Sequence, residues 1–250
     1  MIVSMGIAAP PRQTDAIKGL EIELAQMAGL VESQLAEAIA AFERRDVASA
    51  ERLIVADLRI DDFHHDIEAK VMAILGAGLT NPAALREVMT YMKVAGELER
   101  VGDLAKNVAK RTLVVSRERA PRPYAGVARM GRASLRQIAD ILNAFAARNL
   151  TAAKAVWGGD DELDELYNSI FREILLAMME DPAEVNACTH LVFIAKNFER
   201  VGDHATNIAE AIHFLVTGSA LADERPKGDE TSTTAIRTPD RDPGRAQSGG

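Results

Sequence analysis

The chain has 250 residues, of which 48% are hydrophobic, 26% are charged and only 4% are aromatic. This is the composition of a soluble globular protein with enough chain for one large or two small cores, and its many small and aliphatic residues favour helix bundles over sheets. The formal net charge of −8 argues against a general nucleic-acid-binding protein.

Three helices are predicted in the N-terminal half of the chain. Residues 1–14 are expected to form a flexible arm, and Thr14 or Asp15 can cap the first helix. Polar residues at 45–46 separate the first helix from the second, and glycine, asparagine and proline within 76–82 predict a turn before the third. Apolar residues spaced three and four apart predict these helices over about 16–44, 48–75 and 83–117.

The same order of elements is predicted again in the C-terminal half. Pro121 and Pro123 end the first half, because proline cannot continue a helix. Three further helices are predicted over about 124–148, 152–179 and 183–217. The predicted fold is therefore all-α, with two tandem three-helix bundles over 15–119 and 120–217. A tail over 218–250 lacks apolar periodicity and is expected to be disordered.

The third and sixth predicted helices contain the same stretch of sequence. The run Glu-Arg-Val-Gly-Asp occupies residues 99–103 and returns at residues 199–203. Nine of the fifteen residues in 95–109 are identical to their counterparts in 195–209. We infer that the two halves arose by internal duplication.

Each copy of the repeated stretch carries acidic residues four apart, with an asparagine at the next step of four. These residues are Glu99, Asp103 and Asn107 in the first copy and Glu199, Asp203 and Asn207 in the second. At 100° per residue they form a ridge roughly opposite the apolar seam, so we expect their oxygens to face outward. Carboxylates spaced by four repel each other, and a cation over the ridge would relieve that repulsion.

The middle helix of each half supplies a second pair of acids. Asp57 and Asp61 lie four apart, as do Asp160 and Asp164. If these side chains reach the flank of the long helix, each half gathers four carboxylates, which cannot all stay ionised without a cation or a shared proton. Oxygen-rich clusters suit iron, manganese, magnesium or calcium more than a thiolate metal, and zinc remains open. The alternative is that each pair forms salt bridges with an arginine at 59, 100 or 200.

Three histidines are candidates for an additional nitrogen ligand. His64 and His65 follow Asp61 by three and four residues, and His204 is adjacent to Asp203. Isolated histidines are more often surface or packed residues, so this role is a secondary expectation. The only cysteine, Cys188, is interpreted as a core residue.

The distribution of charge and apolar residues bears on the compartment. Nine basic residues against one acid lie between Lys106 and Arg136, which would suit an anionic membrane surface, an acidic partner, or simply a solvated connection after a helix C-terminus. No apolar run approaches the roughly 18 to 20 residues needed to span a bilayer, so no transmembrane segment is expected. The segment 2–9 does not resemble a signal peptide, and a single cysteine forms no internal disulfide. A cytoplasmic protein is predicted.

Two further runs in the second half carry a family resemblance. Met-Met-Glu-Asp-Pro occupies 178–182, and the long run Phe-Ile-Ala-Lys-Asn-Phe-Glu-Arg-Val-Gly-Asp-His-Ala-Thr-Asn-Ile-Ala-Glu occupies 193–210. With the duplicated helix trio, these runs resemble the PhoU family, the bacterial accessory regulators of phosphate uptake. The resemblance extends over roughly 16–217.

The resemblance implies a function that the residues alone do not show. Members of the family restrain a phosphate-responsive sensor histidine kinase and modulate a high-affinity phosphate ABC transporter, so its implied partners are that kinase and the transporter's ATPase subunit at the inner membrane face. A homodimer peripheral to that membrane is also implied, as is binding of metal ions. The matching metal positions are Asp57, Asp61, Glu99, Asp103, Asp160, Asp164, Glu199 and Asp203.

One segment departs from the family pattern. Family members commonly have Pro-Xaa-Ala-Xaa-Asp-Leu-Arg before the third helix, whereas residues 82–86 here read Pro-Ala-Ala-Leu-Arg. The helix start therefore loses an acidic cap candidate.

Two other functions remain open from the sequence. A carboxylate-bridged metal oxidase would place Glu-Xaa-Xaa-His pairs toward the bundle core, but glycine stands three residues after Glu99 and Glu199. The Asp61 and His64 pair has that spacing in one half only. The other alternative is a structural adaptor that binds no metal. The sequence shows neither a glycine-rich phosphate loop nor a nucleophile with an adjacent base, so a non-enzymatic regulator is predicted.

Overall fold

The computed structural model describes residues 11–221. Within that range every regular element is helical. The elements are α1 (Pro11–Arg44), α2 (Val47–Ala56), α3 (Leu58–Gly76), α4 (Pro82–Val115), α5 (Tyr124–Ala146), α6 (Leu150–Gly158), α7 (Asp160–Glu180), the short 3₁₀ helix η1 (Pro182–Glu184) and α8 (Val185–Thr217). Residues 1–10 of the arm predicted over 1–14, and residues 222–250 of the tail predicted over 218–250, lie outside the described residues.

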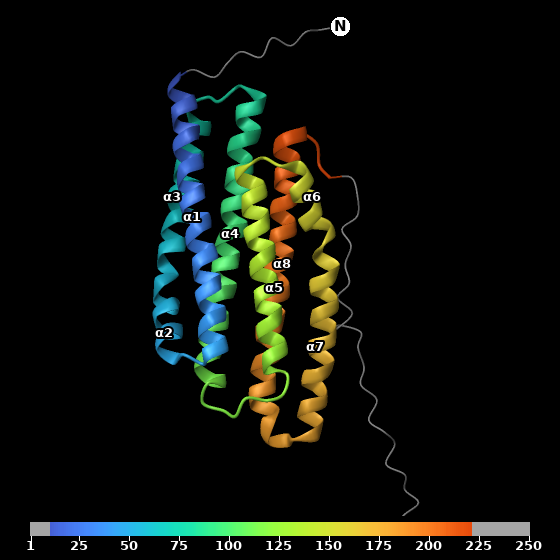
Figure 1. Cartoon of the computed structure of the whole chain (residues 1–250). Coiled ribbons are helices and arrows are strands. Elements are labelled where there is room, and N and C mark those ends of the chain that lie inside the picture. The colour runs from blue at the N-terminus through green and yellow to red at the C-terminus, as the bar shows by residue number, and fades with distance from the viewer. Residues whose placement is uncertain (1–10, 222–250) are drawn as a thin grey trace, which may run out of the picture.

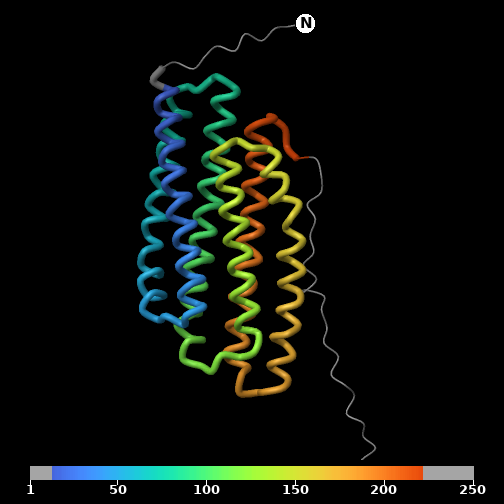
Figure 2. The backbone as a smooth tube through the Cα atoms, in the orientation of Figure 1, coloured from blue at the N-terminus to red at the C-terminus, as the bar shows by residue number. Residues whose placement is uncertain are grey.

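Two three-helix bundles stand side by side, which confirms the predicted fold class (Figure 1). The first bundle consists of α1, α4 and the rod formed by α2 and α3, and the second consists of α5, α8 and the rod formed by α6 and α7. The helices run lengthwise, so the molecule is elongated (Figure 2).

The middle rod of each bundle is broken, where the sequence had predicted one helix. The first rod is interrupted at Asp57, whose backbone remains near-helical while its side chain turns into the bundle. The second rod is interrupted at Gly159, whose N–H still bonds to the carbonyl oxygen of Ala155. The first break lies at the candidate metal residue Asp57, and the second directly precedes the candidate metal residue Asp160.

The same turn joins the first two helices of both halves. Arg45 and Arg148 adopt positive φ angles of 57° and 48°, and each is followed by a residue that caps the next helix. Asp46 accepts from the N–H of Ser49, and Asn149 accepts from the N–H of Ala152. The duplication therefore preserves a strained left-handed residue at a tight corner.

Two helix starts differ from their predicted form. The first helix begins at Pro11 rather than near residue 16, so Thr14 and Asp15 lie inside α1 and do not cap it. At α4 the missing acidic cap is replaced by Asn81, whose side chain accepts from the N–H groups of Ala83 and Ala84. An asparagine is as effective a cap as an aspartate, so α4 begins without penalty.

The two long helices form the centre of the molecule. α4 and α8 pack against each other in antiparallel orientation, and each also contacts the other helices of its own bundle. At one end the rings of Phe42 and Tyr124 stack with centroids 4.4 Å apart, and the Tyr124 hydroxyl donates to the Phe42 carbonyl oxygen. The buried apolar side chains of both halves belong to one continuous core.

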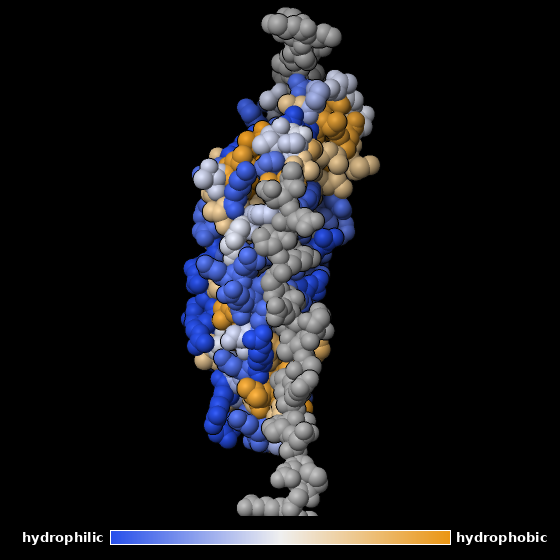
Figure 3. All heavy atoms as spheres, turned by 90° about the vertical axis from the view of Figure 1, so that its right-hand side faces the viewer, coloured by the Kyte–Doolittle hydropathy of each residue, from blue (hydrophilic) through white to orange (hydrophobic). Residues whose placement is uncertain are grey.

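The outer face that carries α6 and α7 is mostly hydrophilic, with hydrophobic residues gathered toward its upper end (Figure 3). Across residues 11–221, none of the helices combines the length and apolar character required to span a bilayer.

Candidate metal-binding carboxylate clusters

The first cluster lies where the joint between α2 and α3 packs against α4. Asp57 occupies this joint and is 1% exposed. Gly102 lies opposite, because a Cβ atom added there would be 3.5 Å from Asp57 Oδ1. Asp61 follows one turn later on α3, which runs antiparallel to α4, so it faces the turn of α4 that carries Glu99. Asp103 lies in the same region, because the Lys106 ammonium contacts both it and Asp57.

The electrostatics of Glu99 show that the acids of this region influence one another. Burial raises the pKa of the Glu99 carboxyl, the negative charges of Asp103 and Asp61 raise it further, and His64 acts in the opposite direction. Like charges that share a site produce this effect, because each disfavours the ionised form of its neighbour.

A lysine and a glutamine hold the buried end of the first cluster. Lys106 Nζ lies 2.5 Å from Asp57 Oδ2 and 3.0 Å from Asp103 Oδ1, so one ammonium pairs with carboxylates from both helices. Gln34 Nε2 on α1 donates to Asp57 Oδ1 at 2.8 Å and to the carbonyl oxygen of Gly102 at 3.2 Å. The hydrogen bond to Asp57 is the main reason that the pKa of Lys106 is raised.

The second cluster repeats the arrangement of acids on α7 and α8. Asp160 is the first residue of α7, and Asp160, Asp164 and Glu199 are 2%, 5% and 5% exposed, whereas Asp203 is half-buried. Lys196 Nζ lies 2.8 Å from Glu199 Oε1. The expectation that the long-helix ridge faces outward is therefore wrong for Glu199, because α7 packs against α8 on that side.

Gly202 allows a close approach of three helices at the second cluster. A Cβ atom at this position would lie 2.6 Å from Leu163 Cδ2 on α7, and 3.0 Å from both Asp160 Oδ1 and Gln137 Oε1. Two acceptor oxygens, one from α7 and one from α5, therefore border the same small space over the glycine. Such a pair of oxygens favours a cation beside them.

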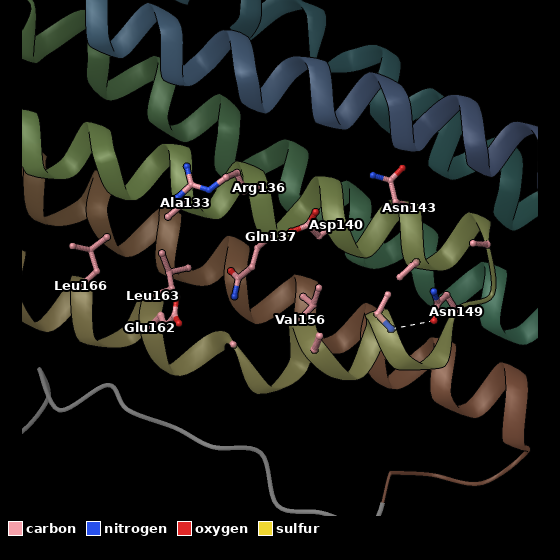
Figure 4. A pocket seen from close by; sticks show the side chains of 15 residues that line it. Ala133, Arg136, Gln137, Asp140, Asn143, Asn149, Val156, Glu162, Leu163 and Leu166 are labelled. Carbon is pink, nitrogen blue, oxygen red and sulfur yellow. Dashed lines mark hydrogen bonds between the residues drawn. The ribbon is translucent and has the colours of Figure 1, made fainter.

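A groove of about 790 Å³ lies between α5, α6 and α7, and its lining includes Gly159 and Leu163, the neighbours in sequence of Asp160 and Asp164. Gln137 lines this groove and points from α5 toward α7 (Figure 4). Its Oε1 atom is buried and has no hydrogen-bond partner among residues 11–221. The other polar side chains of the groove are Arg136, Asp140, Asn143, Asn149 and Glu162.

The two clusters differ in how well they suit a metal ion. Within residues 11–221, no three histidine, cysteine, aspartate or glutamate side chains converge as a preformed metal site, so a bound cation would have to draw carboxylates together. The second cluster fits a hard cation, because oxygens of Asp160 and Gln137 already border one space. The first cluster does not fit, because the Lys106 ammonium lies between Asp57 and Asp103. Metal binding by the eight acids stays a prediction.

The histidines contact other groups. The His65 Nδ1 atom is 2.7 Å from the carbonyl oxygen of Asp61, and His64 Nε2 is 3.7 Å from Glu68 Oε1. His204 turns away from α7 and toward α4, where its Nδ1 lies 2.7 Å from Glu97 Oε2. Cys188 is fully buried, as predicted.

Sequence reasoning missed several residues of these clusters. Gln34 and Gln137 occupy corresponding places on the first helix of each half, and their recurrence at an offset of 103 residues was a usable signal. Lys106 was counted in the basic band, although it turns inward. Arg100, one of the three arginines considered as alternative salt-bridge partners, lies 3.7 Å from Glu97 Oε1.

Comparison with known proteins gives consistent matches over nearly the whole chain. The family described as "PhoU domain" matches residues 24–112 and 127–212, one match in each half. The chain is 44% identical over 215 residues to the phosphate-specific transport system accessory protein PhoU homolog of Caulobacter vibrioides, covering 85% of this chain and 93% of that protein. A homolog of the same name in Rhizobium meliloti is 40% identical over 220 residues, with coverages of 88% and 93%.

Solved structures show the same fold. The crystal structure of PhoU from Pseudomonas aeruginosa matches with a TM-score of 0.80 and 30% identity, over 82% of this chain and 99% of that one. The phosphate transport system regulatory protein PhoU from Streptococcus pneumoniae matches with a TM-score of 0.76 and 27% identity, over 84% and 99%.

Proposed function

Because the chain belongs to the PhoU family, we propose that this accessory protein of phosphate transport is a regulator that represses phosphate-starvation signalling when phosphate is plentiful. It acts on a sensor histidine kinase and modulates a high-affinity phosphate ABC transporter through the ATPase subunit. The observation that carries the proposal is the 44% identity to the Caulobacter vibrioides homolog over 93% of that protein, which leaves no major element of the relative unmatched.

The architecture supports an adaptor rather than an enzyme. The acids lie against α4 and α8 and are held by neighbouring side chains such as Gln34 and Lys106. His64, which follows Asp61 by three residues, lies with its Nε2 atom 3.7 Å from Glu68 Oε1. An elongated bundle of helices with charged outer faces suits binding to other proteins, which needs a complementary surface rather than a reactive group.

Metal ions are part of the proposal. Iron, manganese, magnesium, calcium or zinc would be held by acidic oxygens, with Asp160, Asp164, Glu199 and Asp203 forming the better-suited set. When bound, such an ion would supply positive charge that neutralises the repulsion between these carboxylates. The charge that the second bundle presents to a partner would then depend on metal content.

The proposed setting is the cytoplasmic face of the inner membrane, reached through the partners. A homodimer is included in the proposal, on the strength of the family resemblance. Light scattering coupled to size-exclusion chromatography measures this directly, with a mass near twice 27.0 kDa expected.

The regulatory proposal is tested by deleting the gene for the chain and measuring phosphate-starvation transcripts in high phosphate. We expect derepression, with repression restored by the wild-type chain. Transcript levels that stay low in the deletion strain would overturn the regulatory function. Complementation with an Asp103→Ala/Asp203→Ala variant separates the acids from the rest of the protein, since a metal-free structural adaptor would restore repression fully.

A further inference from the structure

One half of the seam between α4 and α8 carries basic residues and no acids. The segments 104–117 of α4 and 185–198 of α8 together contain five lysines and arginines, but neither aspartate nor glutamate. Lys106 and Lys196 pair with acids of the two candidate clusters. Within residues 11–221, the other three form no ion pair; these are Lys110, Arg111 and Arg117.

Three contacts join this part of α8 to the C-terminal end of α4 and the residues that follow it. The Arg111 guanidinium lies 4.1 Å over the centre of the Phe193 ring, and Arg111 Nη1 is 3.4 Å from His190 Nδ1. Asn186 Nδ2 donates to Glu118 Oε1 at 3.1 Å, which places an acid at the border of this face. We call the face the basic seam, and it consists of Lys110, Arg111 and Arg117 of α4 with Asn186, His190 and Phe193 of α8.

Arg111 and Phe193 give the basic seam the composition of the centre of a protein interface. The Phe193 side chain is 47% exposed, although phenylalanine is usually buried. The face of its ring attracts the Arg111 guanidinium and holds this planar group in place, so less conformational freedom is lost when a carboxylate binds. Arginine and aromatic side chains are enriched at the centres of protein interfaces.

The charge of Arg111 is not balanced by its neighbour across the seam. The side chain is half-buried, and burial lowers the pKa of the guanidinium. Burial and the charge of Arg111 also lower the pKa of His190, so its imidazole is neutral at neutral pH and accepts the hydrogen bond from Arg111. A neutral acceptor leaves the positive charge in place, and a carboxylate from another molecule would neutralise it.

The packing of α4 on α8 does not require these residues. Under the duplication, Lys110 corresponds to Glu210, Arg111 corresponds to Ala211, and Phe193 corresponds to a lysine. The other end of the same seam therefore lacks both the stack of arginine on an aromatic ring and the excess of positive charge. We conclude that the basic seam serves something other than the contact between the two helices.

We propose that the basic seam is a docking surface for an acidic segment of a partner protein, with Arg111 and Phe193 at its centre. Carboxylates of that segment pair with Arg111 and the two neighbouring cations, and an apolar side chain beside them covers the exposed part of the Phe193 ring. A carboxylate suits this surface because it accepts two parallel hydrogen bonds from a guanidinium. The inference rests on the proposed function for the identity of the partner, which is the kinase or the ATPase subunit.

The first test uses fluorescently labelled poly-L-glutamate and the untagged full-length chain at low ionic strength, with binding followed by fluorescence anisotropy. A chain with a formal net charge of −8 has no general attraction for this polymer, so binding reports a local basic surface. We expect Arg111→Ala to weaken binding at least tenfold, and Arg129→Ala, at an exposed arginine of α5, to change it less than twofold. Equal effects of the two substitutions, or no binding by the wild type, would contradict the proposal.

The second test uses the purified cytoplasmic part of the sensor kinase and the purified ATPase subunit, with affinities measured by biolayer interferometry. Arg111→Ala and Phe193→Ala are each expected to weaken the binding of one of these proteins at least tenfold, and poly-L-glutamate is expected to compete with it. Arg129→Ala is the matched control, and circular dichroism checks that every variant is folded. Unchanged affinity of folded Arg111→Ala for both proteins would overturn the proposal.

Other occupants of the basic seam give different results. Wild-type binding to vesicles of phosphatidylglycerol and phosphatidylethanolamine that is lost in Arg111→Ala, with protein binding unaffected, would assign the surface to a membrane and overturn the proposal. A wild-type dimer that becomes a monomer in Arg111→Ala would assign it to a second copy of the chain, with the same consequence.

The outcomes also separate this inference from the proposed function. If the wild type binds a partner protein and Arg111→Ala binds it equally well, the inference fails and the regulatory function stands. If gene deletion leaves the phosphate-starvation transcripts low, the regulatory function fails, whereas binding of poly-L-glutamate that depends on Arg111 still supports a surface for acidic segments.

Discussion

His204 of α8 and Glu97 of α4 form a buried pair between the two halves, with His204 Nδ1 2.7 Å from Glu97 Oε2. Asn207 Nδ2 donates to the same carboxylate oxygen at 3.0 Å. The counterparts of this pair under the duplication are Asn197 and Leu104, which cannot form it. The contact therefore belongs to the junction of the halves and arose after they diverged.

Removing the histidine from this junction is predicted to destabilise the whole chain. His204→Ala leaves the Glu97 carboxylate buried with fewer donors, which costs about 2 kcal/mol in the free energy of unfolding. Urea denaturation followed by circular dichroism measures the loss. His65→Ala, at an exposed histidine, is the matched control and is expected to change stability by less than about 0.5 kcal/mol. Equal effects of the two substitutions would contradict the role assigned to the pair.

The Glu97 carboxylate predicts that the stability of the fold depends on pH. Burial alone would raise the pKa of Glu97, but hydrogen bonds from His204 and Asn207 and the positive charge of His204 and Arg100 outweigh it and hold the pKa below its ordinary value of 4.5. A lowered pKa stabilises the fold above pH 4.5, and this stability is lost as the pH falls through the folded-state value. We expect the melting temperature to drop more steeply below pH 4.5 in the wild type than in Glu97→Gln. If the melting temperatures of the two proteins fall in parallel below pH 4.5, another group dominates the loss of stability in acid.

Replacing a helical glycine with alanine is predicted to have opposite effects on stability at two sites. Gly202→Ala would place a Cβ atom 2.6 Å from Leu163 Cδ2, so overpacking of about 1 to 3 kcal/mol is expected. Gly29→Ala on α1 has nothing within 4 Å of the new atom and is expected to stabilise by up to about 1 kcal/mol, through better helix propensity. Thermal melts of both variants check the signs, and a stabilised Gly202→Ala protein would mean that α7 can move away from α8 freely.

The pairing of Lys106 with Asp57 predicts strong coupling between two substitutions. Lys106→Met removes the ammonium beside a carboxylate that is 1% exposed, so a loss of roughly 3 kcal/mol in unfolding free energy is expected. Adding Asp57→Asn should restore much of it, because the uncompensated charge is gone. A double-mutant cycle from urea denaturation in chelator gives the coupling energy. Additive effects of the two changes would show that the pair contributes little.

The sequence predicted the arrangement of helices because its signals were local or repeated. The spacing of apolar residues and the prolines at 121 and 123 predicted six helical rods, three in each half. The structure contains these six rods, two of them made of two helices each. The breaks at Asp57 and Gly159 were missed because both residues keep near-helical backbone hydrogen bonds, which leave no gap in the apolar pattern.

The candidate clusters were harder to predict than the helices. The four acids of each half were found because their spacing of four recurs, but the orientation of Glu199 was mistaken because a helix covered on several sides has no single outer face. Gln34 and Lys106 come from positions far from Asp57 in sequence, and only the packing of α1, α3 and α4 brings them to it. Polar contacts between residues far apart in the chain produce no periodic pattern in the sequence from which they could be predicted.

The continuous core between the halves has a mechanical consequence. α4 and α8 pack along each other, and Phe42 stacks on Tyr124 at one end, so packed side chains as well as the connecting chain join the two bundles. The predicted boundary at residue 119 falls in the connection between α4 and α5. A force applied to one bundle would therefore be passed to the other through the packed faces of α4 and α8.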